Sequence, residues 1–284
     1  MHVKSYAKVN LTLEVLGKLE NNYHEIASVM QMIDFADDLE IEVASDLTVW
    51  CSRPDLNMAD NLVYTALLAL QQRVDQPVGV SVRITKNMPV AAGLGGGTSN
   101  AVAALLATCK LLAIHLSDAD LYAIAGEIGA DAHYFLSGGT ALVTGWGEKA
   151  HTLPDARTDS DVILLCSDIE LANKTPRMYG ALEPSMFSDA LITDKLVADI
   201  YSGNGVNGNH LYNTFDRVAL QMFPGLQKAW QDFGEATDGA VHLAGSGPTL
   251  FTLIPAERSE GVVERMQSMG YDPVVGSILG GGRE

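Results

Sequence analysis

The sequence has few cysteines, no long hydrophobic run and little positive charge. Its three cysteines, Cys51, Cys109 and Cys166, are far apart and outside any CxxC spacing, so neither a disulfide framework nor a zinc site is predicted. No apolar stretch approaches the roughly 20 residues that a membrane helix needs, and the N-terminus lacks the continuous apolar core of a signal peptide. We therefore expect a cytoplasmic protein with no membrane partner.

The charge balance excludes another class of partner. Lys and Arg total 18 against 35 Asp and Glu, a formal net charge of −17 over 284 residues, which argues against broad contact with nucleic acid backbones. A nucleotide ligand stays possible because backbone amides can hold phosphates. With 47% hydrophobic and 19% charged residues, the chain is predicted to be globular, with about two domains. Monomer and homodimer both remain open.

The first predicted element is a strand from Val3 to Val15. Odd positions are mostly apolar and even positions mostly polar, the period-2 pattern of a strand with one buried face. Lys8 and Asn10 therefore share the polar face, about 6.6 Å apart along the strand.

The other predicted elements mix strands and helices without a steady βαβ rhythm, which favours an α+β fold. Strands are predicted at 39–43, 47–51, 80–85, 140–144, 162–166 and 240–254, the last interrupted by Gly245-Ser-Gly-Pro248. Helices are predicted at 60–74 with Asp60 as N-cap, from the glycine-rich loop to Leu112, from a Ser117 cap to Gly126 or Gly129, and at 215–233 and 258–269. The polar, aperiodic stretch 154–160 predicts a boundary between domains 1–155 and 156–284.

The glycine-rich loop from Pro89 to Ser99 is the sharpest feature. Gly95, Gly96 and Gly97 are consecutive and lead directly into an Ala- and Leu-rich helical run. Free N–H groups at a helix start favour an anion, most naturally a phosphate; a tight packed turn is the structural alternative. A Walker A loop would need a following Lys, and the dinucleotide fingerprint would need Gly at Thr98.

The loop Pro89-Val-Ala-Ala-Gly-Leu-Gly-Gly-Gly-Thr-Ser-Asn-Ala101 resembles the phosphate loop of the galactokinase, homoserine, mevalonate and phosphomevalonate (GHMP) kinase superfamily. Two further stretches, 7–11 and 243–251, fit the other motifs of this superfamily. With the triple glycine, the stretches 23–25, 31–34, 60–63, 129–131 and 145–148 together resemble one member of it closely. The resemblance implies a two-domain fold. Its N-terminal ATP-binding domain would resemble domain 2 of ribosomal protein S5, and its C-terminal domain would be ferredoxin-like.

The resemblance also implies a reaction and its cofactors. With ATP and Mg²⁺, the protein would phosphorylate the tertiary 2-hydroxyl of 4-diphosphocytidyl-2-C-methyl-D-erythritol, in the non-mevalonate route to isoprenoids. Asp131 would accept the hydroxyl proton, and Lys8 would keep Asp131 ionised and stabilise developing negative charge. Without the resemblance, plain structural roles are favoured for both residues, an exposed strand lysine for Lys8 and a cap or turn for Asp131, because isolated charged residues usually lie on the solvated surface.

The superfamily pattern places further residues at the ligands. The ATP contacts are implied at Asn61, Pro89, Val90, Ala91, Ala92, Gly93, Leu94, Gly95, Gly96, Gly97, Thr98 and Ser99, with Ser99 as a metal ligand. The substrate contacts are implied at Asn10, Tyr23, His24, Thr175, Pro176, Tyr179, Gly245, Ser246 and Gly247, the two tyrosines flanking the cytosine. Plain structural roles compete at several positions: an N-cap for Asn61, helix caps for Thr98 and Ser99, packing for Tyr179, and a strand bulge at Gly245.

Two residues depart from the family pattern. Asn22 replaces Gly before Tyr23, and His133 replaces Pro after Asp131. Asn tolerates positive φ, so the turn is expected to survive, and His133 is expected to be a hydrogen-bonded core residue.

Other functions remain possible at this stage. They are another small-molecule kinase of the superfamily, a diphosphomevalonate decarboxylase and a non-catalytic nucleotide-binding module.

Overall fold

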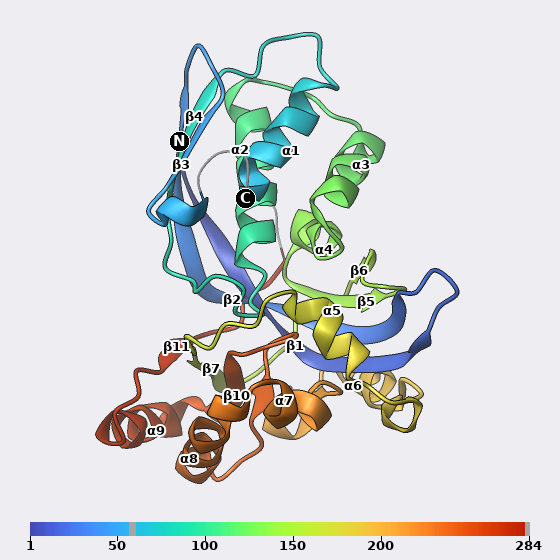
Figure 1. Ribbon diagram of the computed structural model, residues 1–284, viewed down its shortest axis with the longest axis vertical. Helices are drawn as coiled ribbons and strands as arrows, with labels where there is room; N and C mark the ends of the chain where they lie inside the picture. The colour runs from blue at the N-terminus through green and yellow to red at the C-terminus, as the bar shows by residue number, and fades with distance from the viewer. Residues whose placement is uncertain (57–60, 282–284) are drawn as a thin grey trace. The chain divides into compact units, whose positions relative to one another are not determined.

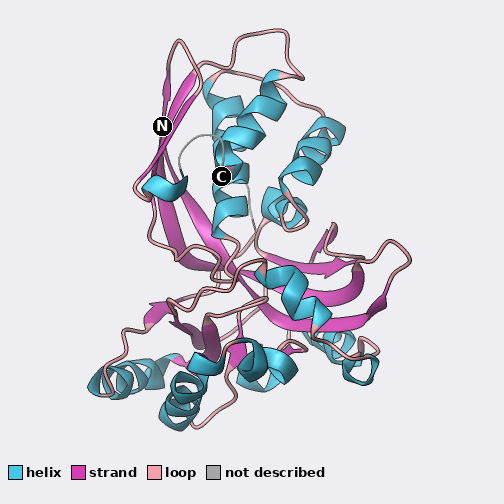
Figure 2. Cartoon of the chain, in the orientation of Figure 1, coloured by secondary structure: helices cyan, strands magenta, loops and turns pink. Residues whose placement is uncertain are grey.

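The computed structural model describes residues 1–56 and 61–281. Strands and helices are mixed along the chain, which confirms the α+β class (Figure 2). The strands are β1 (His2–Lys18), β2 (His24–Val43), β3 (Thr48–Cys51), β4 (Val80–Thr85), β5 (Thr140–Thr144), β6 (Lys149–Thr152), β7 (Ser160–Leu165), β8 (Tyr212–Asn213), β9 (His242–Leu243), β10 (Leu250–Pro255) and β11 (Val274–Gly276).

The helices follow the predicted positions closely in the first half of the chain. The α-helices are α1 (Leu62–Gln71), α2 (Gly96–Leu111), α3 (Asp118–Ile128), α4 (Ala132–Ser137), α5 (Lys174–Gly180), α6 (Leu191–Tyr201), α7 (Asp216–Met222), α8 (Gln227–Thr237) and α9 (Ala256–Ser268). Short 3-10 helices are η1 (Pro54–Leu56), η3 (Pro184–Met186), η4 (Gly208–His210) and η5 (Pro224–Leu226). Within the described ranges, no helix is long and apolar enough to cross a membrane.

The chain divides into two compact units. The first unit comprises Met1–Ala7, Phe35–Val90 and Gly95–Ser137, and the second comprises Lys8–Asp34, Ala91–Leu94 and Gly138–Glu284. Each unit therefore collects segments from distant parts of the sequence. The predicted boundary between residues 155 and 156 stays a prediction about domain organisation.

The first unit packs helices beside a sheet in the order β3-β4-β2-β1. β4 is antiparallel to β2 and parallel to β3, and α1, α2 and α3 lie side by side (Figure 1). Alternate residues of β4 are buried, as the period-2 pattern predicts. The helices bury apolar side chains between them, including Val63, Leu67, Leu105 and Ile124.

Helix ends in the first unit confirm most of the predicted caps. Ser117 accepts a hydrogen bond from the Asp120 N–H at 3.1 Å, and Gly129 ends α3. The N-cap of α1 is Asn61, whose side chain accepts from the Val63 N–H at 3.0 Å. The predicted cap Asp60 lies outside the described residues.

The second unit contains two sheets. One has the order β8-β1-β2-β5-β6, and the other, with the order β11-β7-β10-β9, is antiparallel. Helices α8 and α9 pack against each other, and α9 packs against β7 and β10 (Figure 1). The core includes the fully buried rings of Phe215, Phe223 and Phe233.

One predicted helix in the second unit is wrong in its continuity. The helical spacing at 215–233 predicted a single helix, whereas α7 ends at Met222 and α8 begins at Gln227, with η5 between them. Pro224 follows Phe223 at the break. Proline disfavours the helical conformation in the residue before it and has no N–H for the helix ladder.

The polar face of β1 is buried, which corrects the prediction of a strand with one buried face. Lys8, Asn10, Thr12 and Glu14 are at most 4% exposed. They are tolerated there because they find hydrogen-bond partners. The Thr193 hydroxyl at the start of α6 donates to the Thr12 hydroxyl at 2.9 Å, and the Thr193 N–H donates to Glu14 Oε2 at 2.7 Å.

Replacing Glu14 with Ala tests this buried contact. The change leaves the Thr193 N–H unsatisfied and opens a cavity, so we expect a loss of about 2–4 kcal/mol in the free energy of unfolding. Urea unfolding measures it, with Ala at the exposed Glu40 of β2 as a matched control that changes by at most about 0.5 kcal/mol. Equal losses in the two variants would contradict the assignment.

Candidate active site

The floor of the candidate site is the polar face of β1. Lys8 Nζ donates to Asn10 Oδ1 at 2.8 Å, and Asn10 Nδ2 donates to the Ser28 hydroxyl at 2.8 Å. Ser28 in turn donates to the Thr12 carbonyl at 2.6 Å. The predicted sharing of one face by Lys8 and Asn10 is confirmed, and the chain of bonds fixes the direction of the Lys8 ammonium.

Two glycine-containing segments meet beside Lys8. The loop Ala91–Leu94 accepts the Lys8 N–H through the Leu94 carbonyl at 3.0 Å. A Cβ added to Gly93, whose φ is +89°, would lie 1.9 Å from the Ala244 carbonyl oxygen, so only glycine permits this approach. A Cβ on Gly245 would lie 2.9 Å from the Gly93 carbonyl oxygen and 3.0 Å from Lys8 Nζ. The predicted phosphate and diphosphate segments are therefore adjacent in this unit.

The second segment, the turn Gly245–Gly247, is held by side chains from other parts of the second unit. Asn213 Nδ2 donates to the carbonyls of Leu243 and Gly245, each at 2.8 Å. The hydroxyls of Ser246 and Thr175 are 3.1 Å apart, so two predicted substrate residues lie together. Asn213 was missed because nothing in its local sequence distinguishes it from a turn residue.

The predicted cytosine residues lie in a group of aromatic side chains. The Tyr23 ring, 56% exposed, is 5.0 Å from the Trp146 ring, and the His24 ring stacks on the Tyr179 ring at 4.8 Å. Trp146 was missed as a contact, although its motif was noticed. Asn22 has a φ of 67°, which confirms that the turn before Tyr23 accommodates asparagine.

His24 is biased toward its neutral form. Burial, and after it the charge of Lys18, lower the pKa of His24 below its usual value. A neutral imidazole carries one donor and one acceptor, the combination needed to bind the edge of a base.

The start of α2 carries the rest of the predicted phosphate loop, in the first unit. Gly95 is the N-cap in the left-handed region, with a φ of 74° and no side-chain cap, and Gly96 and Gly97 form the first turn. Ser99 is buried; its hydroxyl donates to the Tyr6 carbonyl at 2.7 Å and accepts from Ser5 at 2.8 Å. Ser99 thus has a structural role besides the predicted one.

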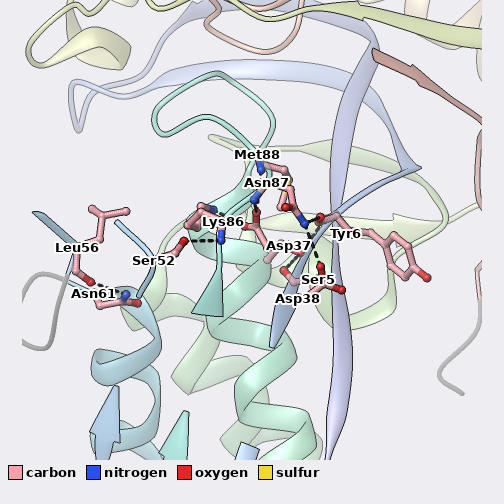
Figure 3. A network of polar contacts seen from close by, with 12 residues as sticks. Ser5, Tyr6, Asp37, Asp38, Ser52, Leu56, Asn61, Lys86, Asn87 and Met88 are labelled. Atoms are coloured by element: carbon pink, nitrogen blue, oxygen red, sulfur yellow. Dashed lines mark hydrogen bonds and ion pairs between the residues drawn. The ribbon is translucent and has the colours of Figure 1, made fainter. Parts of the chain in front are cut away.

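A buried ion pair lies beside this helix start (Figure 3). Lys86 pairs with Asp37, which is fully buried and also accepts the N–H groups of Asn87 and Met88 at 2.7 and 2.8 Å. A Cβ on Gly96 would lie 3.2 Å from Lys86 Nζ. The buried position of Lys86 was not predicted, because a lone lysine after a strand is ordinarily a surface residue.

Three other predicted residues of the first unit can be placed. Asn61 caps α1 and donates through Nδ2 to the Leu56 carbonyl at 2.7 Å (Figure 3). Asp131 is half-buried between α3 and α4. The burial of Tyr134, and after it the charge of Asp131, raise the pKa of Tyr134. His133 is buried, with its ring nitrogens 3.4 and 3.2 Å from backbone carbonyls, which confirms the core role.

The remaining predicted residues lie near these groups in sequence. Val90, Ala91, Gly97 and Pro176 are exposed, Pro89 and Thr98 are half-buried, and Ala92 and Leu94 are buried. Across the described ranges, no three His, Cys, Asp or Glu side chains are grouped so as to hold a metal ion.

The chain is similar to known proteins in sequence and in fold. The chain matches the family described as GHMP kinases N terminal domain over residues 61–145. It is 34% identical over 276 residues to a 4-diphosphocytidyl-2-C-methyl-D-erythritol kinase of Dehalococcoides mccartyi, covering 96% of each chain. A crystal structure of 4-(cytidine 5'-diphospho)-2C-methyl-D-erythritol kinase superposes with a TM-score of 0.83 at 28% identity, covering 99% of this chain and 100% of that one.

A more distant structure shares the fold alone. Mevalonate pyrophosphate decarboxylase from Streptococcus pyogenes superposes with a TM-score of 0.69 at 15% identity, over 100% of this chain and 98% of that one.

The fold is that of the GHMP kinases, as predicted, in its two-domain α+β form. Within that class, the chain belongs to the family of 4-diphosphocytidyl-2-C-methyl-D-erythritol kinases. It is therefore an enzyme that transfers a phosphoryl group, which sets aside the non-catalytic module.

The Asp37 and Lys86 pair gives a stability prediction. Asp37→Ala leaves a buried ammonium without its carboxylate, so we expect a loss of about 3–5 kcal/mol in the free energy of unfolding. The neighbouring Asp38 is exposed, and Asp38→Ala is the matched control, with an expected loss below about 1 kcal/mol. Chemical denaturation of both variants measures the difference. A loss at Asp37 no larger than at Asp38 would contradict the buried pair.

Proposed function

We propose that the protein uses ATP to phosphorylate the 2-hydroxyl of 4-diphosphocytidyl-2-C-methyl-D-erythritol in the non-mevalonate route to isoprenoid precursors. The observation that carries the proposal is the junction in the second unit. There the Lys8 ammonium lies beside two backbone segments that approach each other through glycine. This junction occurs in a chain whose relatives bear the name of that kinase.

Lys8 and Asp131 are the proposed catalytic residues. An alcohol is a poor nucleophile at neutral pH, so phosphoryl transfer needs a group that accepts its proton and a cation that offsets negative charge. Asp131 has the proton-accepting role, and Lys8 has the cationic one. The hydrogen bond to Asn10 supports the role of Lys8, because an ammonium that is already oriented need not reorganise when charge develops.

ATP is proposed to bind with its phosphates at residues 89–99 and its adenine near Asn61. The N–H groups at the start of α2 favour an anion. Asn61 already uses both ends of its amide, in the cap of α1 and on the Leu56 carbonyl. An adenine contact would therefore be shared with these bonds.

Mg²⁺ fits this proposal through Ser99. A hydroxyl has one donor and two acceptor lone pairs, and Ser99 uses the donor and one lone pair within the protein. The second lone pair of the Ser99 hydroxyl is left to bind a metal ion. When bound, the ion would neutralise charge on the phosphates.

The substrate is proposed to bind in the second unit. The turn Gly245–Gly247 and Thr175 would hold its diphosphate, and Asn10 would contact its alcohol portion. The cytosine would lie on the exposed Tyr23 ring, with its edge bound by His24. Tyr23 is supported by its 56% exposure, which leaves part of its ring in solvent, and by its ring contact with Trp146. Stacking on such a surface tolerates any base, so selectivity would come from the polar edge.

Turnover tests the catalytic roles. The wild type with ATP, Mg²⁺ and the named alcohol is expected to release ADP and a monophosphate ester at the 2-oxygen, followed by coupled assay and ³¹P NMR. Lys8→Met and Asp131→Asn are each expected to lower kcat by about 10²–10⁴-fold while ATP binding is retained.

Matched controls are available for both variants. Lys4 is exposed on the same strand as Lys8, and Asp118 is exposed at the start of α3. Lys4→Met and Asp118→Asn should keep wild-type turnover. ADP release with homoserine or mevalonate but not with the cytidine compound would overturn the proposed substrate.

A separate variant tests the cytosine platform. Tyr23→Ala removes a stacking surface worth about 1–3 kcal/mol, so we expect the KM for the alcohol to rise about tenfold or more with kcat changed far less. Steady-state kinetics measures both constants. Tyr201→Ala, at an equally exposed ring on α6 (65%), is the control. A rise in KM that is the same for both variants would argue against Tyr23 as the platform.

A further inference from the structure

A second lysine lies at the junction of the two glycine segments. Lys174, the first residue of α5, donates through Nζ to the Ala91 carbonyl at 2.6 Å and to the Gly247 carbonyl. It thereby ties the loop Ala91–Leu94 to the turn Gly245–Gly247. Nothing in the sequence pattern distinguished it from an exposed helix residue.

The ammonium of the half-buried Lys174 is held by two carbonyl groups. It takes part in none of the ion pairs formed by the described residues. The nearby charged group is another cation: burial, and then the charge of Lys8, lower the pKa of Lys174 to about 8. The two segments that it ties carry no titratable side chain, and Arg177, on the same helix, is exposed.

This arrangement is costly for the protein alone. A half-buried ammonium close to a like charge is unfavourable, and carbonyl dipoles offset only part of that cost. A dianionic ligand would offset more, because it would interact with the Lys174 ammonium as a full opposite charge. Lys174 also has a third N–H beyond the two it gives to carbonyls.

We propose that Lys174 binds the diphosphate of the cytidine substrate, giving its third N–H to a phosphate oxygen while it holds the two glycine segments together. The assignment to the substrate diphosphate, and not to the ATP phosphates, follows from the next residue. The Thr175 hydroxyl is 3.1 Å from that of Ser246, so the start of α5 faces the turn proposed for the diphosphate. The inference rests on the proposed function for the identity of that ligand.

The pH dependence of CDP binding tests the proposal without turnover. An anion that contacts Lys174 favours its protonated form, so binding weakens once pH exceeds the pKa of the free protein. Calorimetry with CDP should show a Kd that rises about sixfold between pH 7.5 and 9.5 and then levels off near the value of the neutral form. In Lys174→Gln, which keeps a neutral donor, the Kd at pH 7.5 should be about tenfold weaker and nearly constant with pH.

Controls separate ligand binding from a structural role. Lys195→Gln, at an exposed position of α6, should behave as the wild type, and ADP binding should change little in either variant. With the full substrate, Lys174→Gln should raise KM about tenfold and leave kcat within about threefold. The proposal would be overturned if Lys174→Gln lowered only thermal stability and kcat. It would also be overturned if the variant bound ADP more weakly but CDP as tightly as the wild type.

The two hypotheses fail differently. If the wild type binds CDP with the expected pH dependence but never phosphorylates the alcohol, the proposed function fails, and the role of Lys174 in binding a diphosphate is still supported. If turnover occurs and Lys174→Gln binds CDP as the wild type does, the inference fails and the function stands.

Discussion

The buried polar face of β1 is the constraint on which the second unit depends. A strand that buries both faces must satisfy every polar side chain it carries. Here one row of hydrogen bonds runs from Lys8 through Asn10 and Ser28 to Thr12, which joins Glu14 through Thr193. Among the described residues, Glu14 Oε1 alone in this row has no hydrogen-bond partner. Each of these bonds restricts the rotamers of the two side chains that it joins. Residues that stabilise the fold therefore also fix the direction of the Lys8 ammonium. Stability and placement of the cation therefore have the same cause.

Close backbone approach is the second requirement, and it explains why glycine recurs in the two segments. Ala244 and Gly93 come so near that no side chain fits between them. Asn213 and Lys174 hold the segments in place, because the amide of Asn213 and the ammonium of Lys174 both donate hydrogen bonds to their carbonyl oxygens. Glycine permits the approach, and these donors maintain it.

The sequence predicted what local rules govern. The strand β1 itself, the Ser117 cap and the glycine-led start of α2 follow from residue type and spacing, and all three are present. Burial of Glu14 could not be predicted, because its pattern equals that of a solvated strand face and only a distant helix, α6, covers it. Lys86, Asn213 and Lys174 were missed for a related reason: their partners are 30 to 83 residues away in sequence. The break at Pro224 did have a local signal, which the helical spacing outweighed.

The lysines also show how an acidic protein can bind anions. With a net charge of −17, the average field repels nucleotides, so attraction must come from local cations in poorly hydrated places. Lys86 is neutralised by the buried Asp37, and its contribution is mainly to fix the chain beside α2. Lys174 joins no ion pair within the described part of the chain, and its neighbour is the cation Lys8. A half-buried ammonium held by carbonyl oxygens, as in Lys174, costs stability in the free protein. A ligand that carries its own negative charge can offset that cost.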